Sequence, residues 1–117
     1  MTYRIAAATS NGWVINQHFG RTAEFTILDV DPEDGEIQLV ERRPSTPPCN
    51  GGSHDVGFLQ KAAKNLSDCD YLLASRVGPG AAACLEAEGI QVYELPGWIE
   101  ESVEKLLNYI EIQKLLS

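Results

Sequence analysis

The sequence predicts a single α/β domain in which a mixed β-sheet carries helices on its faces. Three observations predict this class. Residues 1–43 are dominated by β-forming runs, residues 44–53 hold a break rich in proline and glycine, and helical and strand patterns alternate after the break. A chain of 117 residues is long enough for one domain with its own core and too short for two, so we expect one domain over residues 1–117.

The first half predicts strands joined by turns. Residues 3–9 are compatible with a strand that ends at Ser10-Asn11-Gly12, a turn signal that should return the chain through residues 13–15. Residues 24–30 and 37–43 are two more β-forming runs, separated by a turn rich in Asp, Pro and Gly. Three consecutive strands joined by short turns predict an antiparallel meander.

The second half begins with a helix and a buried strand. Residues 56–66 carry apolar side chains at helical spacing, and Ser53 or Asp55 is the expected N-cap. Residues 71–74 form a short apolar run without alternation, which is typical of a strand covered on both faces.

The remaining segments complete the alternation. A helix over 81–88 should end at Gly89, a strand over 90–94 should follow, and the clearest helical stripe in the chain comes last, formed by Ile99, Val103, Leu106, Leu107 and Ile110. The order is therefore βββαβαβα, and helices that alternate with strands indicate parallel crossovers. We predict a ribonuclease-H-like three-layer fold, a five-stranded mixed sheet with helices on its faces.

Composition and charge narrow the function classes. The formal net charge is -8, from 9 Lys and Arg against 17 Asp and Glu, and this acidic balance argues against a nucleic-acid or anionic-lipid surface. No apolar run of about eighteen residues predicts a membrane helix, and the N-terminus shows no targeting pattern. Three cysteines without CxxC spacing are typical of free thiols in a reducing compartment, so we expect a cytoplasmic protein.

The first motif with chemical potential is the polar loop around His18-Phe19-Gly20. A histidine beside glycine can present an unhindered imidazole, a common ligand for borderline metals. The alternative is a surface histidine whose neighbour Phe19 plugs the core.

The second motif runs from Cys49 to Asp55, where Cys49 and His54 flank two glycines before a helix. A helix N-terminus lowers a thiol pKa and favours anions, so a thiolate or an anionic cluster would be stabilised here. The alternative is that the glycines serve the turn and His54 is solvated, because this spacing is not a specific zinc signature.

The third motif is Arg76-Val77-Gly78-Pro79-Gly80, between a strand and a helix. Arg76 could pair with an anion at the carboxyl end of the strand, where open α/β sheets usually bind ligands. A tight turn with a solvated arginine explains the same residues. Cys69 and Cys84 are interpreted as core residues, since free cysteine packs as a small hydrophobe.

Two enzyme classes are alternatives to a binding role. A two-metal nuclease needs acidic residues on its central strands, and residues 4–8 supply none. A thiol-dependent enzyme would need Cys49 activated by a base such as His54, and this remains an alternative although no known nucleophile motif surrounds Cys49.

Together the motifs resemble a known family. The pattern resembles the dinitrogenase iron-molybdenum cofactor biosynthesis family of NifX-like proteins in Asn16-x-His18-Phe19-Gly20, Cys49-x-Gly51-Gly52, Asp68-Cys69-Asp70 and Gly78-x-Gly80. The similarity covers nearly the whole chain, and His18-Phe19-Gly20 is its most specific part.

The resemblance implies a ribonuclease-H-like fold and a non-catalytic carrier of an iron-sulfur cluster, iron-molybdenum cofactor or its precursor, in nitrogenase cofactor assembly and nitrogen fixation. It implicates His18 in binding. By chemistry Cys49 is a second candidate ligand and His54 a third, with Arg76, Gly78 and Gly80 as further cofactor-binding residues. The alternative within the family is a carrier of a different iron-sulfur or molybdenum cluster.

The expected partners are the donor and acceptor proteins of cluster assembly, with the chain itself a monomer or a weak homodimer. The bound cluster is expected to be labile, and it can be absent after purification. We expect a solvated, acidic hairpin end formed by Asp29, Asp31, Glu33, Asp34 and Glu36. Because these carboxylates repel an anion, we expect the cluster at the opposite side, near His18, Arg21, Arg76 and the helix N-terminus after Cys49.

Overall fold

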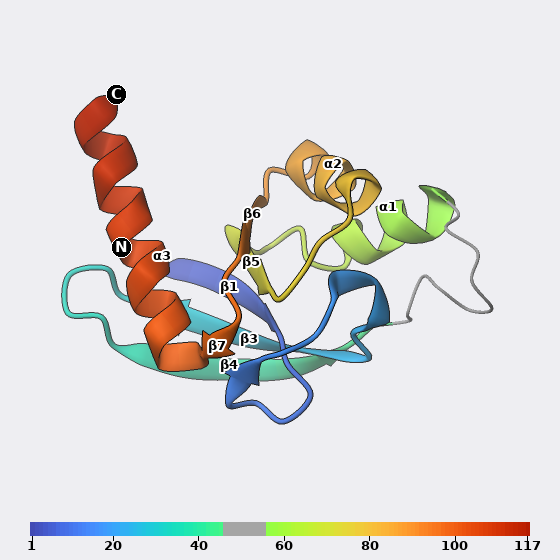
Figure 1. The fold of residues 1–117 in the computed structure, drawn as a ribbon, viewed down its shortest axis with the longest axis horizontal. Coiled ribbons are helices and arrows are strands. Elements are labelled where there is room, and N and C mark those ends of the chain that lie inside the picture. Colours follow the sequence, from blue (N-terminus) through green and yellow to red (C-terminus); the bar gives the residue numbers. More distant parts are fainter. Residues whose placement is uncertain (46–55) are drawn as a thin grey trace.

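A five-stranded mixed sheet forms the centre of the fold (Figure 1). The structure is a computed structural model that describes residues 1–45 and 56–117. The strand order is β4-β3-β1-β5-β6. The strands are β1 (Tyr3–Ala8), β3 (Glu24–Val30), β4 (Ile37–Pro44), β5 (Tyr71–Ala74) and β6 (Gln91–Glu94).

The pairing of the strands confirms a mixed sheet. β1 and β3 pair antiparallel, as do β3 and β4, so the predicted meander exists as β1, β3 and β4. β1 and β5 pair parallel, as do β5 and β6, in agreement with the predicted crossovers. The α/β class and the five-stranded mixed sheet are thus confirmed, and the ribonuclease-H-like class stays a prediction.

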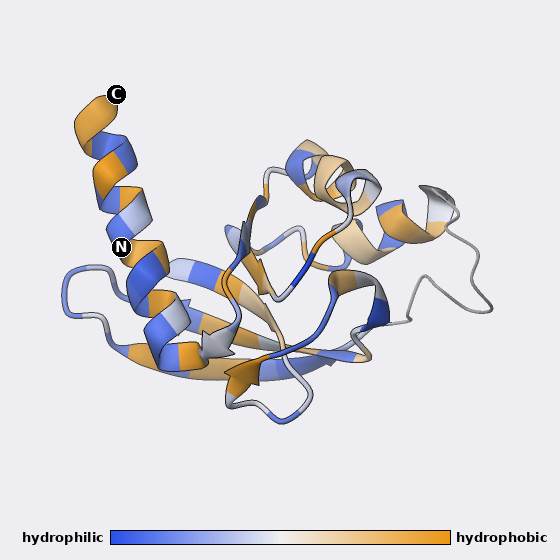
Figure 2. Ribbon diagram, viewed as in Figure 1, coloured by the Kyte–Doolittle hydropathy of each residue, from blue (hydrophilic) through white to orange (hydrophobic). Residues whose placement is uncertain are grey.

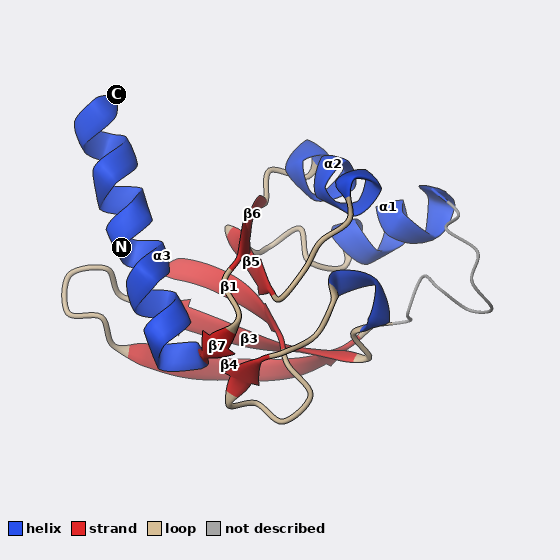
Figure 3. Ribbon diagram, in the orientation of Figure 1, coloured by secondary structure: helices blue, strands red, loops and turns tan. Residues whose placement is uncertain are grey.

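Helices cover both faces of the sheet (Figure 3). Helices α1 (Val56–Lys64) and α2 (Pro79–Ala87) pack on one face, and α3 (Ile99–Leu116) packs on the other. Figure 1 shows α1 and α2 together, with α3 apart from them. The apolar stripe predicted for the last helix is confirmed, because Ile99, Val103, Leu106 and Ile110 are buried and Leu107 is half-buried.

Strand β1 explains how two separate cores share one sheet. Successive side chains of a strand point to opposite faces, so Ile5 and Ala7 pack toward α3 while Ala6 and Ala8 pack toward α1 and α2. All four are fully buried, which is why the segment is continuously apolar instead of alternating.

The expected return of the chain through residues 13–15 is wrong as a pairing with the first strand. β2 (Val14–Ile15) pairs instead with β7 (Gly97–Trp98), in a separate two-stranded sheet. Gly12 makes the predicted turn with a φ of 81°. Both edges of β1 are already occupied by β3 and β5, so β2 finds its partner after β6.

Two helix ends refine the sequence prediction. α2 begins at Pro79, two residues earlier than expected, because the fixed φ of proline suits the first helical position. Gly89 follows its C-cap with a φ of 81°, the left-handed conformation that ends many helices, which confirms the predicted stop. The proposed N-cap residues of α1, Ser53 and Asp55, lie outside the described residues.

The C-terminal end of α3 extends past the sheet (Figure 1), and Figure 2 shows hydrophobic and hydrophilic residues alternating along the helix to its end. Within the described residues, no helix combines the length and the apolar character that crossing a membrane requires.

Candidate functional site

The loop between β2 and β3 presents His18 to solvent while its neighbours anchor it. A short 3-10 helix, η1 (Phe19–Arg21), follows His18 directly. The Phe19 side chain is buried and lies 5.6 Å from Phe25, ring centroid to ring centroid. The carbonyl of His18 accepts hydrogen bonds from the Arg21 amide at 3.1 Å and from the Thr22 hydroxyl at 2.7 Å. The backbone at His18 is therefore fixed and its imidazole is exposed. The structure confirms the alternative interpretation of this loop, a surface histidine whose neighbour Phe19 plugs the core, and the ligand role of His18 stays a prediction.

The His18 loop lies beside the loop that follows β5. The Phe19 amide donates to the Arg76 carbonyl at 3.0 Å, and the Ser75 amide donates to the Gln17 carbonyl at 3.0 Å. An isolated parallel β-bridge joins His18 and Arg76 at the same place. The first and third sequence motifs thus form one structural unit, although they lie far apart in the sequence.

A cavity of about 630 Å³ opens where these loops meet. It lies at the carboxyl ends of β5 and β6 and at the N-terminus of α2, the usual ligand position in open α/β sheets. Its lining combines the His18 loop, the β5–α2 loop, the first turn of α2, and one residue each from α1 and β6: His18, Gly20, Arg21, Leu59, Arg76, Val77, Gly78, Pro79, Gly80, Ala81 and Glu94.

The α2 N-terminus gives the cavity a positive dipole end. Its N-cap, Gly78, makes no side-chain capping bond, and Pro79 at the first turn has no amide hydrogen. A Cβ at Gly78 would meet no atom within 4 Å, and a Cβ at Gly80 would make an ordinary 3.5 Å contact with Leu59. Space therefore does not demand glycine at these positions; what the glycines do is leave the backbone open to a ligand.

Glu94 places a negative group among these positive ones. Its Oε2 accepts a hydrogen bond from the Val77 amide at 2.8 Å, and this bond joins the end of β6 to the β5–α2 loop. Sequence reasoning missed Glu94 and Leu59. The rule that ligands bind at the carboxyl ends of parallel strands could have indicated Glu94, which is the last residue of β6.

The arginines are divided between structure and cavity. Arg4 pairs with Asp29 and Asp68, and Arg43 pairs with Asp68 and Glu41, at distances of 2.7 to 3.2 Å. Arg21 and Arg76 are exposed cavity residues and enter none of these ion pairs within the described chain.

The Arg43 and Arg4 guanidinium groups hold the pKa of the Asp68 carboxyl well below its usual range, mainly through the side-chain hydrogen bonds from Arg43. Asp29 was expected in a solvated acidic group, and the structure corrects this expectation because Asp29 is half-buried against Arg4. In Figure 1 the turn at residues 31–36 projects at the left of the view, whereas the loop that holds η1 lies right of centre, on the side of α1. The position of a bound cluster stays a prediction.

The cysteines and the second histidine have separate outcomes. Cys49 and His54 lie outside the described residues. Cys69 is buried, and its burial raises the pKa of its thiol to about 12. Cys84 is half-buried against the core of the α1 and α2 face, so packing is confirmed for both Cys69 and Cys84. No group of three or more His, Cys, Asp or Glu side chains in the described chain is arranged to hold a metal ion.

Comparison with known proteins supplies the family. The family model for dinitrogenase iron-molybdenum cofactor matches residues 1–109. The chain is 36% identical over 105 residues to the FeMo cofactor biosynthesis protein NifB of Frankia alni, covering 87% of this chain and 20% of that protein. It is 32% identical over 80 residues to protein NifY of Klebsiella pneumoniae, covering 68% of this chain and 32% of that protein.

The chain therefore spans a fifth to a third of the length of these relatives. A solved NMR structure of a putative NifB protein from Thermotoga shares the fold with a TM-score of 0.58 and 24% identity, covering 89% of this chain and 86% of that chain. At that identity the likeness supports the fold and nothing finer.

Proposed function

The chain belongs to the dinitrogenase iron-molybdenum cofactor family, and from this premise we propose that it is a carrier without catalytic activity. Its cargo is an iron-sulfur cluster, the iron-molybdenum cofactor or a precursor, held in the cavity beside His18 during cofactor assembly. A cytoplasmic location, the ribonuclease-H-like class, and donor and acceptor proteins as partners belong to the same proposal.

One observation carries the proposal: the backbone bridge between His18 and Arg76. It brings an exposed imidazole, two guanidinium groups and a helix N-terminus to the edge of one cavity. An imidazole is a ligand for iron, and guanidinium groups and helix amides stabilise an anion. A cluster with negative charge would find here both a metal ligand and a compensating field.

The cavity suits a cargo that must be released. His18 is exposed, and within the described lining its side chain makes no hydrogen bond that would orient it as a general base. Glu94 adds a carboxylate that opposes an anion, so attraction in the cavity is partly offset. These features support reversible binding over turnover. Cys49 and His54 are proposed as further ligands on chemical grounds, since thiolate is a preferred ligand of iron-sulfur clusters.

Anaerobic reconstitution tests this function. The protein is incubated with ferrous iron and sulfide, and bound iron and the visible absorption of the cluster are measured after desalting. Wild type should retain a brown cluster, and His18→Ala should lower its affinity at least tenfold. His54→Ala, at the other histidine, measures whether that residue contributes. A wild-type protein that retains no cluster, or equal retention by wild type and His18→Ala, would show the proposed site to be wrong.

A further inference from the structure

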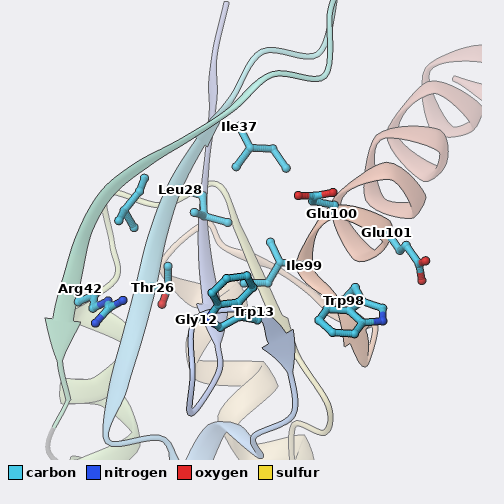
Figure 4. Close-up of a pocket in the computed structure, with 11 residues that line it drawn as sticks. Gly12, Trp13, Thr26, Leu28, Ile37, Arg42, Trp98, Ile99, Glu100 and Glu101 are labelled. Atoms are coloured by element: carbon cyan, nitrogen blue, oxygen red, sulfur yellow. The ribbon is translucent and has the colours of Figure 1, made fainter.

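A second concave surface lies on the face of the sheet opposite the His18 cavity. Two cavities of about 430 and 520 Å³ share Ile37 and Glu100, so they form one continuous trough beside the N-terminal half of α3. One end of the trough is shown in Figure 4, where Trp13 and Ile99 lie between β4 and α3. Leu28, Ile37 and Ile99 of its lining belong to the α3 core, whereas Leu59 and Ala81 of the His18 cavity belong to the α1 and α2 core.

The floor of the trough is apolar and exposed. The side chains of Leu28, Ile37 and Leu39 form its sheet side, and Leu39 is 60% exposed. Trp13 and Trp98, the two tryptophans of the chain, line one end and are 69% and 57% exposed. Large indole and aliphatic side chains gathered in one depression are typical of binding surfaces, where tryptophan contributes strongly to affinity.

The rim of the trough is mainly acidic. Glu100, Glu101 and Glu104 come from the first turns of α3, and Asp34 stands at the far end. Arg42 is the basic side chain among the described lining residues. None of the rim carboxylates enters an ion pair found in the described chain. The trough therefore offers an apolar floor with negative charge along its helical wall.

The width of the opening fits a helix. One face of the sheet carries α1 and α2, while the other carries α3 alone in the described chain, which leaves the β3 and β4 side uncovered. Two strands span about 10 Å, which is close to the diameter of an α-helix with its side chains.

We propose that this trough is the docking surface for an amphipathic helix of a partner protein. The helix carries an aliphatic stripe that packs on Ile37, Leu39 and the tryptophans, and lysine or arginine beside the stripe pairs with Glu100, Glu101 and Glu104. Because the trough and the His18 cavity lie on opposite faces, a partner docked here leaves the cavity open to cargo. The inference goes beyond the carrier function and does not depend on it.

The test uses two synthetic peptides of matched helicity, without tryptophan or tyrosine. Both have leucines at i, i+3 and i+7 spacing; lysines flank the stripe in one and glutamates in the other. Trp13 and Trp98 supply the fluorescence signal. The lysine peptide should bind saturably with a blue shift that weakens in salt, and the glutamate peptide should bind at least tenfold more weakly.

Two variants decide whether the trough is responsible. Leu39→Glu should weaken the lysine peptide at least tenfold, while Leu115→Glu, at a leucine 83% exposed near the end of α3, should leave it unchanged. Thermal unfolding checks that both variants are folded. No binding by wild type, equal binding of the two peptides, or full binding by Leu39→Glu would overturn the proposal.

Sedimentation of the protein without peptide tests whether a second copy of the chain, and not a partner helix, covers the trough. A chain that dimerises and becomes monomeric on Leu39→Glu would show that a second copy covers the trough, and this result would also overturn the proposal. The expected result is the same sedimentation coefficient for wild type and Leu39→Glu.

Discussion

The His18 cavity and the trough lie on opposite faces of one sheet, and they differ in the structural elements and the side chains that form them. Loops and a helix N-terminus form the cavity, and two arginines give it positive charge. Side chains along β4 and α3 form the trough, which is apolar with an acidic rim. In the described residues of a chain of net charge -8, two arginines that enter none of the ion pairs found there lie beside one cavity, and most of the charges along the trough are carboxylates.

Ion pairing sharpens that separation. Arg4 and Arg43 are neutralised by Asp29, Asp68 and Glu41, so they add little to the electrostatic field elsewhere. Arg21 and Arg76 line the cavity instead. The two regions should therefore respond to different substitutions, and the following predictions are ordered from the largest expected effect to the smallest.

Phe19→Ala should lower the stability of the protein by removing the side chain that anchors the His18 loop. Phe19 is buried against Phe25 beneath His18, and removing a buried phenylalanine costs about 3–5 kcal/mol in the free energy of unfolding. Urea unfolding measures this loss, and the milder Phe19→Leu should cost about 1 kcal/mol. A Phe19→Ala protein of wild-type stability would contradict the anchoring role.

Arg76→Ala and Arg42→Ala compare the two regions directly. Arg76 lines the cavity and Arg42 lines the trough, and both are exposed arginines. Loss of Arg76 should weaken retention of the reconstituted iron-sulfur cluster by roughly tenfold, because a charged partner of an anion contributes about 1.5 kcal/mol. Arg42→Ala should leave cluster retention unchanged. Equal loss of cluster in the two variants would contradict the assignment of the cluster to the His18 cavity.

Asp68→Asn should lower the stability of the fold and leave binding at the His18 cavity and at the trough unchanged. The pKa of Asp68 is lowered in the folded protein, chiefly by hydrogen bonds from Arg43, so its carboxylate stabilises the fold above the unfolded pKa. This contribution is lost as the pH falls through the folded pKa. Since the side chain is 43% exposed, solvent screening limits the cost at pH 7 to about 1 kcal/mol or less.

Urea unfolding from pH 7 down into the acid range checks this prediction. The stability gap between wild type and Asp68→Asn should narrow as the pH falls. Glu33→Gln, at an exposed glutamate in the β3–β4 turn, is the matched control and should leave stability unchanged. A gap that widens at low pH would show the sign to be wrong.

Glu94→Gln and Glu94→Ala separate the effect of the negative charge of Glu94 from the effect of its hydrogen bond to the β5–α2 loop. Glutamine removes the negative charge and keeps an oxygen that can accept from the Val77 amide, so cluster affinity should rise roughly threefold. Alanine also removes the acceptor, which frees the loop and should cancel that gain. Affinity unchanged from wild type in Glu94→Gln would indicate that Glu94 does not oppose the cargo.

Local patterns allowed most of the fold to be predicted. The stripe of α3, the turn at Gly12 and the stop at Gly89 depend on residues near one another in the sequence, so their outcome was readable. The partner of β2 could not be predicted in this way, because it depends on which strand edges remain free after β1 has paired with both β3 and β5. The start of α2 differs from the predicted start because Pro79 suits the first position of a helix.

The sites were predictable to different degrees. His18 and Arg76 each stand in a recognisable loop, but their adjacency depends on the parallel pairing of β1 with β5. Trp13 and Trp98 carry no motif, and they line the same cavity because β2 and β7, two strands of two residues each, pair across the chain. Motifs indicated the chemistry of the cavity, whereas the trough could be found only from the folded surface.

The central claim is that the imidazole of His18 holds the cargo at the cavity, and a spectroscopic measurement tests it most directly. The protein is produced with ¹⁵N-labelled histidine, reconstituted anaerobically and reduced, and pulsed electron paramagnetic resonance is used to detect nitrogen coupled to the cluster. We expect a ¹⁵N coupling that is present in wild type and in His54→Ala and absent in His18→Ala. A coupling that persists in His18→Ala, or a loaded wild type without histidine coupling, would contradict the account.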